Sequence, residues 1–142
     1  MGQISVGGLV NRRVARIRRI YYVFRGEVDG PNGPVELNFV DGTCALFDAG
    51  PDGDSLRVTS TPWLDPFREP LSAVNEEFVR ESGKWTGFDV STEPAFAKYV
   101  GATILSVSGI AAYGLVAGAL LSFADGHLKI EAAGDELYVE AE

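Results

Sequence analysis

The chain has 142 residues, 46% of them hydrophobic, and carries a formal net charge of −8 at pH 7. This length and apolar content fit one domain with a core of its own, and the negative charge argues against nucleic acid as the main partner, because phosphate binding needs a cationic surface. No apolar run approaches the roughly 20 residues of a membrane helix, no secretory signal is visible, and the single cysteine, Cys44, favours a reducing cytoplasmic compartment.

The first 25 residues differ from the rest of the chain in charge. They contain six arginines and no acid, whereas the remaining residues include 6 basic and 20 acidic side chains and hence carry −14. Such a body suits a basic protein partner. The alternative is that the charge only keeps a small protein in solution.

Residues 10–58 predict a four-stranded antiparallel meander. The leading strand, residues 10–20, has apolar residues three apart, which we interpret as a strand with a bulge. Asp41-Gly42 predicts a type I′ turn between residues 35–39 and 44–46, which would place Phe39 opposite Cys44 and Leu37 opposite Leu46, all on one side. Residues 51–53 then enlarge the turn before Leu56 and Val58.

The arginines of the leading strand alternate between its two faces. We expect one face to carry Arg12, Arg16 and Arg18 and the other Arg13 and Arg19. Their expected partners are the acidic residues Glu76, Glu77 and Glu81, although surface ion pairs typically contribute less than about 1 kcal/mol each.

An insert at residues 61–99 separates this meander from the rest. Residues 62–67 form a proline-rich loop, and residues 70–81 predict an amphipathic helix with a stripe of Leu71, Val74 and Phe78, Pro70 in its first turn and Gly83 after its end. Residues 84–90 predict an extra short strand. A brief helix after residues 91–94 is expected to pack Phe96 and Tyr99 into the core.

Residues 100–139 repeat the first meander. Residues 10–20 align with 100–110, residues 35–50 with 119–134 at six identities in 16 positions, and residues 54–58 with 135–139. Asp125-Gly126 and Gly134-Asp135 predict the two turns of this copy. The sequence therefore predicts a mainly β (α+β) single domain over residues 1–142, in which two duplicated meanders form a β-roll or partly closed barrel. Four pairs should occupy equivalent buried sites in one core: Leu37 and Leu121, Phe39 and Phe123, Leu46 and Ile130, Val58 and Val139.

Few residues suit catalysis or metal binding. Cys44 is interpreted as a small buried hydrophobe beside Phe39, and His127, the only histidine, as an exposed strand residue. Asp48, Asp52 and Asp54 share a loop that could hold Ca²⁺, but it lacks EF-hand spacing and is better interpreted as a turn. We therefore predict no catalytic, metal or cofactor-binding residue, and no cofactor.

The acidic insert, residues 61–90, is the predicted partner-binding region because the repeat does not require it. Aromatic residues are enriched at binding hot spots, so Tyr21, Tyr22 and Trp85 join Trp63 as candidate anchors; for Trp85, core packing is the alternative. The predicted partner-binding residues are Trp63, Asp65, Glu69, Glu76, Glu77, Arg80 and Glu81.

The second copy, with its glycine turn, strand and L-x-F-x-D-G-x-L-x-I pattern at residues 121–130, resembles small uncharacterised bacterial β-meander proteins. Some of these are immunity partners of secreted polymorphic toxins. The resemblance implies a non-enzymatic immunity protein that neutralises a basic toxin domain by occlusion, and it transfers no functional residue. Two alternatives are a small-ligand-binding β-roll or enzyme of unknown reaction, and a structural homo-oligomer, for example a homodimer.

Overall fold

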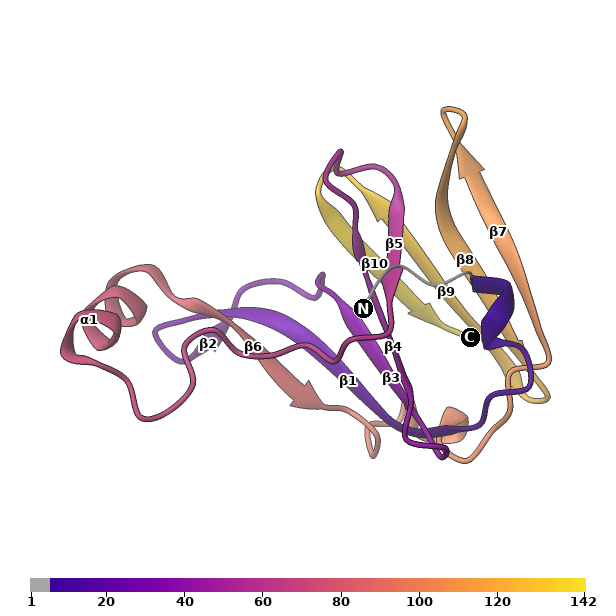
Figure 1. Ribbon diagram of the computed structural model, residues 1–142, viewed down its shortest axis with the longest axis horizontal. Coiled ribbons are helices and arrows are strands. Elements are labelled where there is room, and N and C mark those ends of the chain that lie inside the picture. The colour runs from indigo at the N-terminus through magenta and orange to yellow at the C-terminus, as the bar shows by residue number, and fades with distance from the viewer. Residues whose placement is uncertain (1–5) are drawn as a thin grey trace.

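Two antiparallel sheets form the body of the protein (Figure 1). The structure, a computed structural model, describes residues 6–142. The first sheet contains β1 (Val14–Phe24), β2 (Glu27–Val28), β3 (Val35–Phe39), β4 (Cys44–Ala49), β5 (Leu56–Thr59) and β6 (Lys84–Asp89). The second contains β7 (Ser106–Ala112), β8 (Leu115–Phe123), β9 (Gly126–Ala133) and β10 (Glu136–Ala141). The helical elements are η1 (Val6–Leu9), α1 (Ala73–Ser82) and η2 (Ala97–Tyr99).

The mainly β fold with antiparallel sheets agrees with the prediction, but the sheets do not close into a barrel. The first sheet has the order β2-β1-β3-β4-β5, with β6 on the other side of β1, and the second has the order β10-β9-β8-β7. The predicted extra strand and brief helix are present as β6 and η2, and the latter buries Phe96 and Tyr99 as expected.

Both meanders contribute to one hydrophobic core between the sheets. Leu37 and Phe39 of the first meander and Leu121 and Phe123 of the second are at most 5% exposed and belong to the same buried cluster. None of the fully buried residues of that cluster lies between residues 60 and 89. The insert up to β6 therefore lies outside the main core.

The leading segments of the two meanders pair with each other. Arg13 and Thr103, which the repeat aligns, lie opposite each other in an antiparallel bridge. Val14 donates its backbone N–H to Ala102 O at 2.9 Å and accepts one from Gly101 at 2.7 Å. When aligned residues face each other across an antiparallel pair, a two-fold axis relates the surrounding segments, which is the symmetry that two equivalent halves require.

The register of the first hairpin differs from the prediction. Asn38 pairs with Cys44 and Leu37 with Ala45, because the turn has three residues, 40–42, closed by a bond from Phe39 N–H to Thr43 O. Gly42 has φ +88° whereas Asp41 has no positive φ, so this is not the type I′ turn expected. One extra residue reverses the faces of β4, and Ala45 and Phe47 therefore enter the core instead of Cys44 and Leu46.

This shift also corrects one pair of equivalent sites. Ile130 is fully buried, but Leu46 is only half-buried on the other face of β4, and the buried counterpart of Ile130 is Phe47. Val58 pairs with Phe47 as Val139 pairs with Ile130. Val58 is buried, whereas Val139 is only partly buried.

The second meander keeps the predicted faces but not all of the predicted turns. A turn at Asp125-Gly126 would place Phe123 opposite Leu128 and Leu121 opposite Ile130, but Phe123 pairs with Gly126 and Leu121 with Leu128. The turn therefore consists of residues 124–125 and is not the type I′ turn expected. The Gly134-Asp135 turn is confirmed, with φ +56° and +67° and the expected pairing of Ala132 with Leu137. Two further two-residue turns have positive φ at both positions, residues 25–26 and 113–114.

The leading strand and the helix are mostly as predicted. β1 has a bulge between Val14 and Arg16, whereas in the second copy the strand begins only at Ser106. The helix begins later than predicted, because the Ser72 side chain caps it by accepting a bond from Asn75 N–H at 3.1 Å. Gly83 follows its end, as expected, with φ +78°.

The shared core predicts the effect of truncating either aromatic residue. Phe39→Ala and Phe123→Ala should each lower the free energy of unfolding by about 3 to 5 kcal/mol, as for other buried aromatics. Because a whole domain is stable by only about 5 to 15 kcal/mol, thermal unfolding followed by circular dichroism should show a clear fall in Tm. Val40→Ala is the matched control, since Val40 is 62% exposed, and equal melting of Phe39→Ala and this control would contradict the shared core.

Candidate functional site

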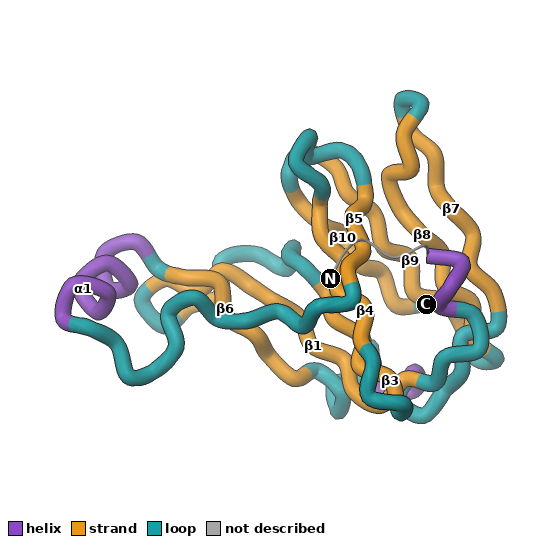
Figure 2. Tube along the Cα trace, viewed as in Figure 1, coloured by secondary structure: helices purple, strands orange, loops and turns teal. Residues whose placement is uncertain are grey.

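One end of the first sheet projects beyond the body formed by the two packed sheets and carries the helix (Figures 1 and 2). We call this part, residues 21–28 and 64–89, the arm. It consists of the end of β1, the β2 hairpin, the proline-rich loop, α1 and β6. Within it, β6 pairs with β1 from Arg18 opposite Asp89 to Val23 opposite Lys84. The arm contains most of the insert that the sequence predicted to bind a partner.

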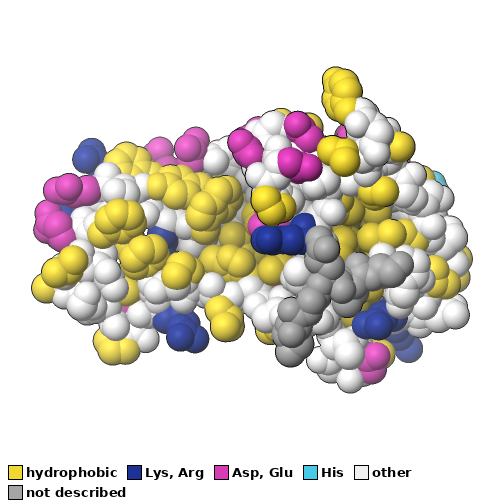
Figure 3. Space-filling view, turned by 45° about the horizontal axis from the view of Figure 1, so that its top comes forward, with side chains coloured by type: hydrophobic (Ala, Val, Ile, Leu, Met, Phe, Trp, Pro, Cys, Tyr) yellow, Lys and Arg dark blue, Asp and Glu magenta, His cyan; other side chains and the backbone are white. Residues whose placement is uncertain are grey.

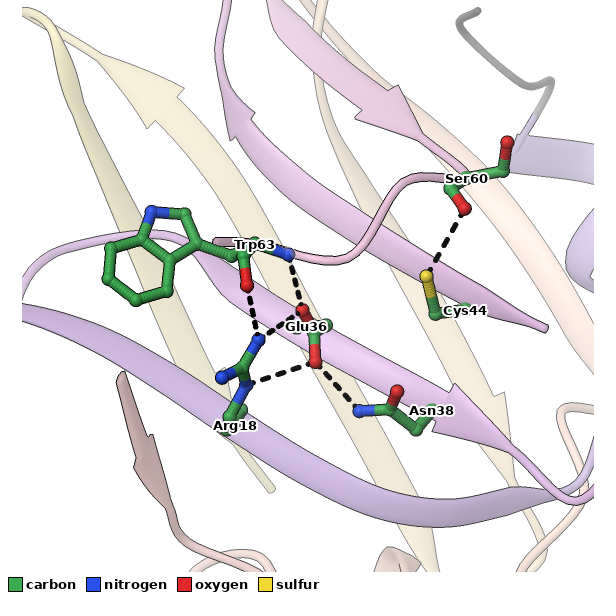
Figure 4. Close-up of polar contacts among 6 residues, drawn as sticks. All are labelled: Arg18, Glu36, Asn38, Cys44, Ser60 and Trp63. Atoms are coloured by element: carbon green, nitrogen blue, oxygen red, sulfur yellow. Dashed lines mark hydrogen bonds and ion pairs between the residues drawn. The ribbon is translucent and has the colours of Figure 1, made fainter. Parts of the chain in front are cut away.

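A buried glutamate at the base of the arm holds the insert against the first sheet. Glu36 lies on β3, on the face opposite the core, and its side chain is fully buried. Arg18 donates to both of its oxygens, Nε to Oε1 at 3.0 Å and Nη2 to Oε2 at 2.8 Å. Asn38 Nδ2 donates to Oε1 at 2.8 Å and the backbone N–H of Trp63 donates to Oε2 at 2.7 Å (Figure 4).

The same contacts determine where Trp63 lies. Arg18 Nη2 also donates to the carbonyl of Trp63 at 2.8 Å, and its guanidinium carbon is 5.8 Å from the centre of the indole. Nearby, Cys44 Sγ donates to Ser60 O at 3.3 Å (Figure 4). These contacts at Ser60 and Trp63 hold residues 60–63 against the outer face of the first sheet.

This network overturns the expected partners of the arginines. Arg18 pairs with Glu36, and the described residues contain no ion pair between the leading strand and the helix acids Glu76, Glu77 and Glu81. Arg19 is 3% exposed and donates to Pro31 O at 3.0 Å and Gly33 O at 3.2 Å, which fixes that loop. Arg16 and Arg18 do share the outer face and Arg19 the opposite one, as their pairing with Asn38, Glu36 and Val35 requires.

The predicted partner-binding residues fall into two groups. Trp63 and Asp65 are half-buried in the loop, where Asp65 pairs with Lys84 and accepts from Phe67 N–H at 2.8 Å. The others are exposed: Glu69 lies before the helix, Glu77 pairs with Arg80 on α1, and Glu76 and Glu81 lie on the same helix. The structure does not bring the two groups into a single cluster.

The apolar stripe of the helix is largely exposed, contrary to the amphipathic packing expected. No residue of α1 is buried; Val74 is 78% exposed and Phe78 51% exposed, with only Phe67 stacked on Phe78 at 5.4 Å between ring centres. Val28, Leu64 and Trp85 add exposed apolar area to the arm. Figure 3 shows hydrophobic side chains gathered along this end of the molecule. Sequence periodicity identified the stripe but could not show that residues 6–142 leave most of it exposed.

A groove lies where the arm meets both meanders. Its volume is about 300 Å³, and its walls include the side chains of Trp63 and Trp85. Tyr22 holds Trp85 edge-on at 5.5 Å between ring centres. The lining residues are Ile20, Asn32, Gly33, Pro34, Asp48, Trp63, Trp85, Asp135, Glu136 and Leu137.

The residues considered for catalysis or metal binding lie apart from this groove, except Asp48. Burial raises the pKa of the Cys44 thiol, which disfavours the reactive thiolate, and His127 is exposed beside Ser122. Asp52 accepts bonds from Asp54 and Ser55 within its own turn. Across residues 6–142, no three His, Cys, Asp or Glu side chains are arranged to hold a metal ion.

Comparison with known proteins identifies no relative. No family model, no curated protein and no solved structure matches the chain. Within the described residues, no helix is long and apolar enough to cross a membrane.

The buried glutamate predicts a pH dependence of stability. Burial alone would raise the pKa of Glu36, but the hydrogen bonds from Arg18, Asn38 and Trp63 outweigh it and hold that pKa below its ordinary value of 4.5. Ionised Glu36 therefore stabilises the fold above pH 4.5, and this stabilisation is lost as the pH falls through the lower, folded value.

Glu36→Gln should cost about 1.5 to 3 kcal/mol at neutral pH, the range for hydrogen bonds to a charged group. The difference from the wild type should shrink in acid, and urea unfolding over a pH series measures it. Glu140→Gln, which removes the same charge at an exposed strand position, should show a small difference at every pH. A pH-independent effect of Glu36→Gln would contradict the assignment.

Replacing the exposed arginines of the leading segment should affect stability less than replacing Arg18. Arg12 donates to Thr43 Oγ1 at 2.9 Å and Arg13 to Gly101 O at 2.8 Å, both in exposed contacts, and Arg16 is exposed. Replacing these three together by glutamine should change the free energy of unfolding by less than about 1 kcal/mol, as is typical of surface charges. Arg18→Gln should cost more, because it leaves Glu36 buried without its ion pair, and urea unfolding should order the variants accordingly.

Proposed function

We propose that this protein is a non-enzymatic, protein-binding module whose partner docks on the arm. The observation that carries this proposal is that α1 buries none of its residues while it presents Val74 and Phe78 to solvent. An amphipathic helix normally buries its apolar face against another element, and contiguous exposed apolar area marks interaction surfaces. The arm supplies such a face at a distance from the core.

Charge supports a basic partner. Beyond its first 25 residues the chain carries −14, and three of the ten residues of α1 are glutamates. Opposite charge on the partner would speed association and select against acidic proteins. The negative charge of α1 also disfavours self-association through this helix, because two copies would bring like-charged glutamates together. A homodimer is therefore the less favoured alternative.

The most specific form of the proposal is an immunity protein, acting in the cytoplasm, that occludes a basic toxin domain. It is supported by the resemblance of residues 121–130 to bacterial β-meander proteins, some of which are immunity proteins, and by the acidic arm with its exposed apolar side chains. The alternative of a small-ligand-binding β-roll is less favoured, because the two sheets do not close into a barrel that could enclose a ligand.

Co-expression with the products of neighbouring genes, followed by affinity capture at several salt concentrations, tests the proposal. We expect a salt-sensitive complex, and Val74→Ser should weaken it by about 10-fold or more, as expected for a hot-spot side chain. Val116→Ser is the matched control, because Val116 is 56% exposed on β8 in the other sheet. Failure to capture any neighbour, or equal weakening by both variants, would contradict it.

A further inference from the structure

We propose that the groove between the arm and the body receives an arginine or lysine side chain of the protein partner; this inference rests on the proposed function and names the contact that would give it specificity. The occupant follows from charge complementarity. Three of the ten lining residues are carboxylic acids, Asp48, Asp135 and Glu136, and none is basic. A cation entering this groove would meet negative charge in a partly desolvated setting, where electrostatic interactions are stronger than in water.

The aromatic walls add a second source of affinity for a cation. Trp63 and Trp85 both line the groove. Indole is the best aromatic partner for a cation, and such an interaction contributes about 0.5 to 2 kcal/mol depending on desolvation. Tyr22 packs edge-on against Trp85, and the Glu36 network fixes the backbone of Trp63. Both walls are therefore held in place before a partner arrives, which reduces the entropy lost on binding.

Of the three carboxylates in the groove, Asp48 should gain most from an ion pair with a bound cation. It is half-buried, and burial raises its pKa against the smaller opposing effects of the Ala49 N–H and of Arg57. Within residues 6–142 it forms no ion pair. Arg57 lies opposite Asp48 on β5 but forms no direct ion pair with it. A partly desolvated carboxylate without a direct ion pair gains more from a new one than an exposed carboxylate does.

The remaining wall is also fixed by contacts. Glu136 accepts from Tyr138 OH at 3.0 Å and from Asn32 Nδ2 at 3.4 Å. Asp135 donates its backbone N–H to Gly53 O at 2.9 Å, and a Cβ on Gly53 would lie 2.2 Å from Asp135 Oδ1, so glycine is required for this approach. Gly33 likewise has no room for a Cβ, which would lie 1.9 Å from Ile20 O and 3.2 Å from the Trp85 ring.

The size and position of the groove suit one side chain of a larger partner. A volume of about 300 Å³ is at the lower limit of small-molecule sites, which span about 300 to 1,000 Å³. Trp85, 45% exposed, belongs to both the groove and the arm, and Leu64, 63% exposed, follows Trp63 directly. A partner covering the apolar face of the arm would thus place a neighbouring basic residue at the groove, and buried arginines are common interface hot spots.

N-acetyl-arginine amide and N-acetyl-lysine amide serve as probes, with N-acetyl-citrulline amide as the neutral match for arginine. In titrations followed by ¹H–¹⁵N NMR, the two cationic probes should give saturable shifts at the indole N–H groups of Trp63 and Trp85 and at the amides of Asp135 and Glu136. Citrulline amide should give none. Equal shifts with citrulline amide, or no saturable shift with either cationic probe, would overturn the proposal.

Variants locate the binding within the groove. Asp48→Asn and Glu136→Gln should each weaken binding of the arginine probe several-fold, and together about 10-fold or more, whereas Asp125→Asn, the same charge change at the exposed 124–125 turn, should leave it unchanged. Equal weakening by Asp125→Asn would indicate only long-range attraction and overturn the site. Because these titrations need no partner, their failure is distinguishable from failure to capture one. In a captured complex, the Asp48→Asn, Glu136→Gln variant should dissociate faster than the wild type.

Discussion

The burial of the Glu36 carboxylate, on the face of the first sheet that points away from the core, determines how the insert is attached to that sheet. Glu36 lies between core residues on β3 but points to the opposite face, away from the core between the sheets. A buried charge without partners would be strongly destabilising, so the chain must bring donors to it from elsewhere. It does so with Arg18 from the neighbouring strand and with the backbone of Trp63 from the insert. The departure of the insert from the body is therefore fixed by an electrostatic requirement.

The alternation of side chains along β1 also determines which residues lie next to this network. The face of β1 that carries Arg18 also carries Ile20 and Tyr22. Because Tyr22 pairs with Trp85, the side chain of Trp85 lies on the same face. Trp63 and Trp85 therefore line the groove from this outer face, and Leu137 of the buried cluster lines it from the second sheet. Arg19 is the buried charged side chain on the core-facing side of β1. Its guanidinium bonds to the 31–33 loop, and its Nε has no hydrogen-bond partner among the described residues.

Alternation predicted the faces of β3, β8 and β9, and the Gly-Asp turn predicted the register of β9 with β10, because in each of these places the local pattern is the only determinant. The first hairpin shows where this fails: Asp41 side-chain bonds to Thr43 at 2.9 and 2.6 Å favour a three-residue turn, and one residue is enough to exchange Cys44 for Ala45 in the core. The exposure of Val74 and Phe78 was equally out of reach, since a stripe is the same whether or not something covers it.

The candidate site shows the same division between local and distant effects. The sequence identified the insert and Trp63, which the repeat leaves unexplained. It could not identify Asp135 and Glu136 as neighbours of Trp85, because they come from the far end of the chain, nor the ion pair of Glu36, whose partners are 18 and 27 residues away. Contacts of that kind depend on tertiary packing, and spacing in the sequence contains no record of them.

The pairing of residues 11–14 with 101–104 has a consequence for how the protein can change. The two halves are joined there by their own backbone hydrogen bonds, and residues 60–89 contribute nothing to the fully buried cluster. The segments that build the core are therefore separate from residues 64–82. Loops on a rigid frame tolerate sequence change well, so residues 64–82 should be replaceable by other sequences on an unchanged body, provided that the Glu36 contacts are kept.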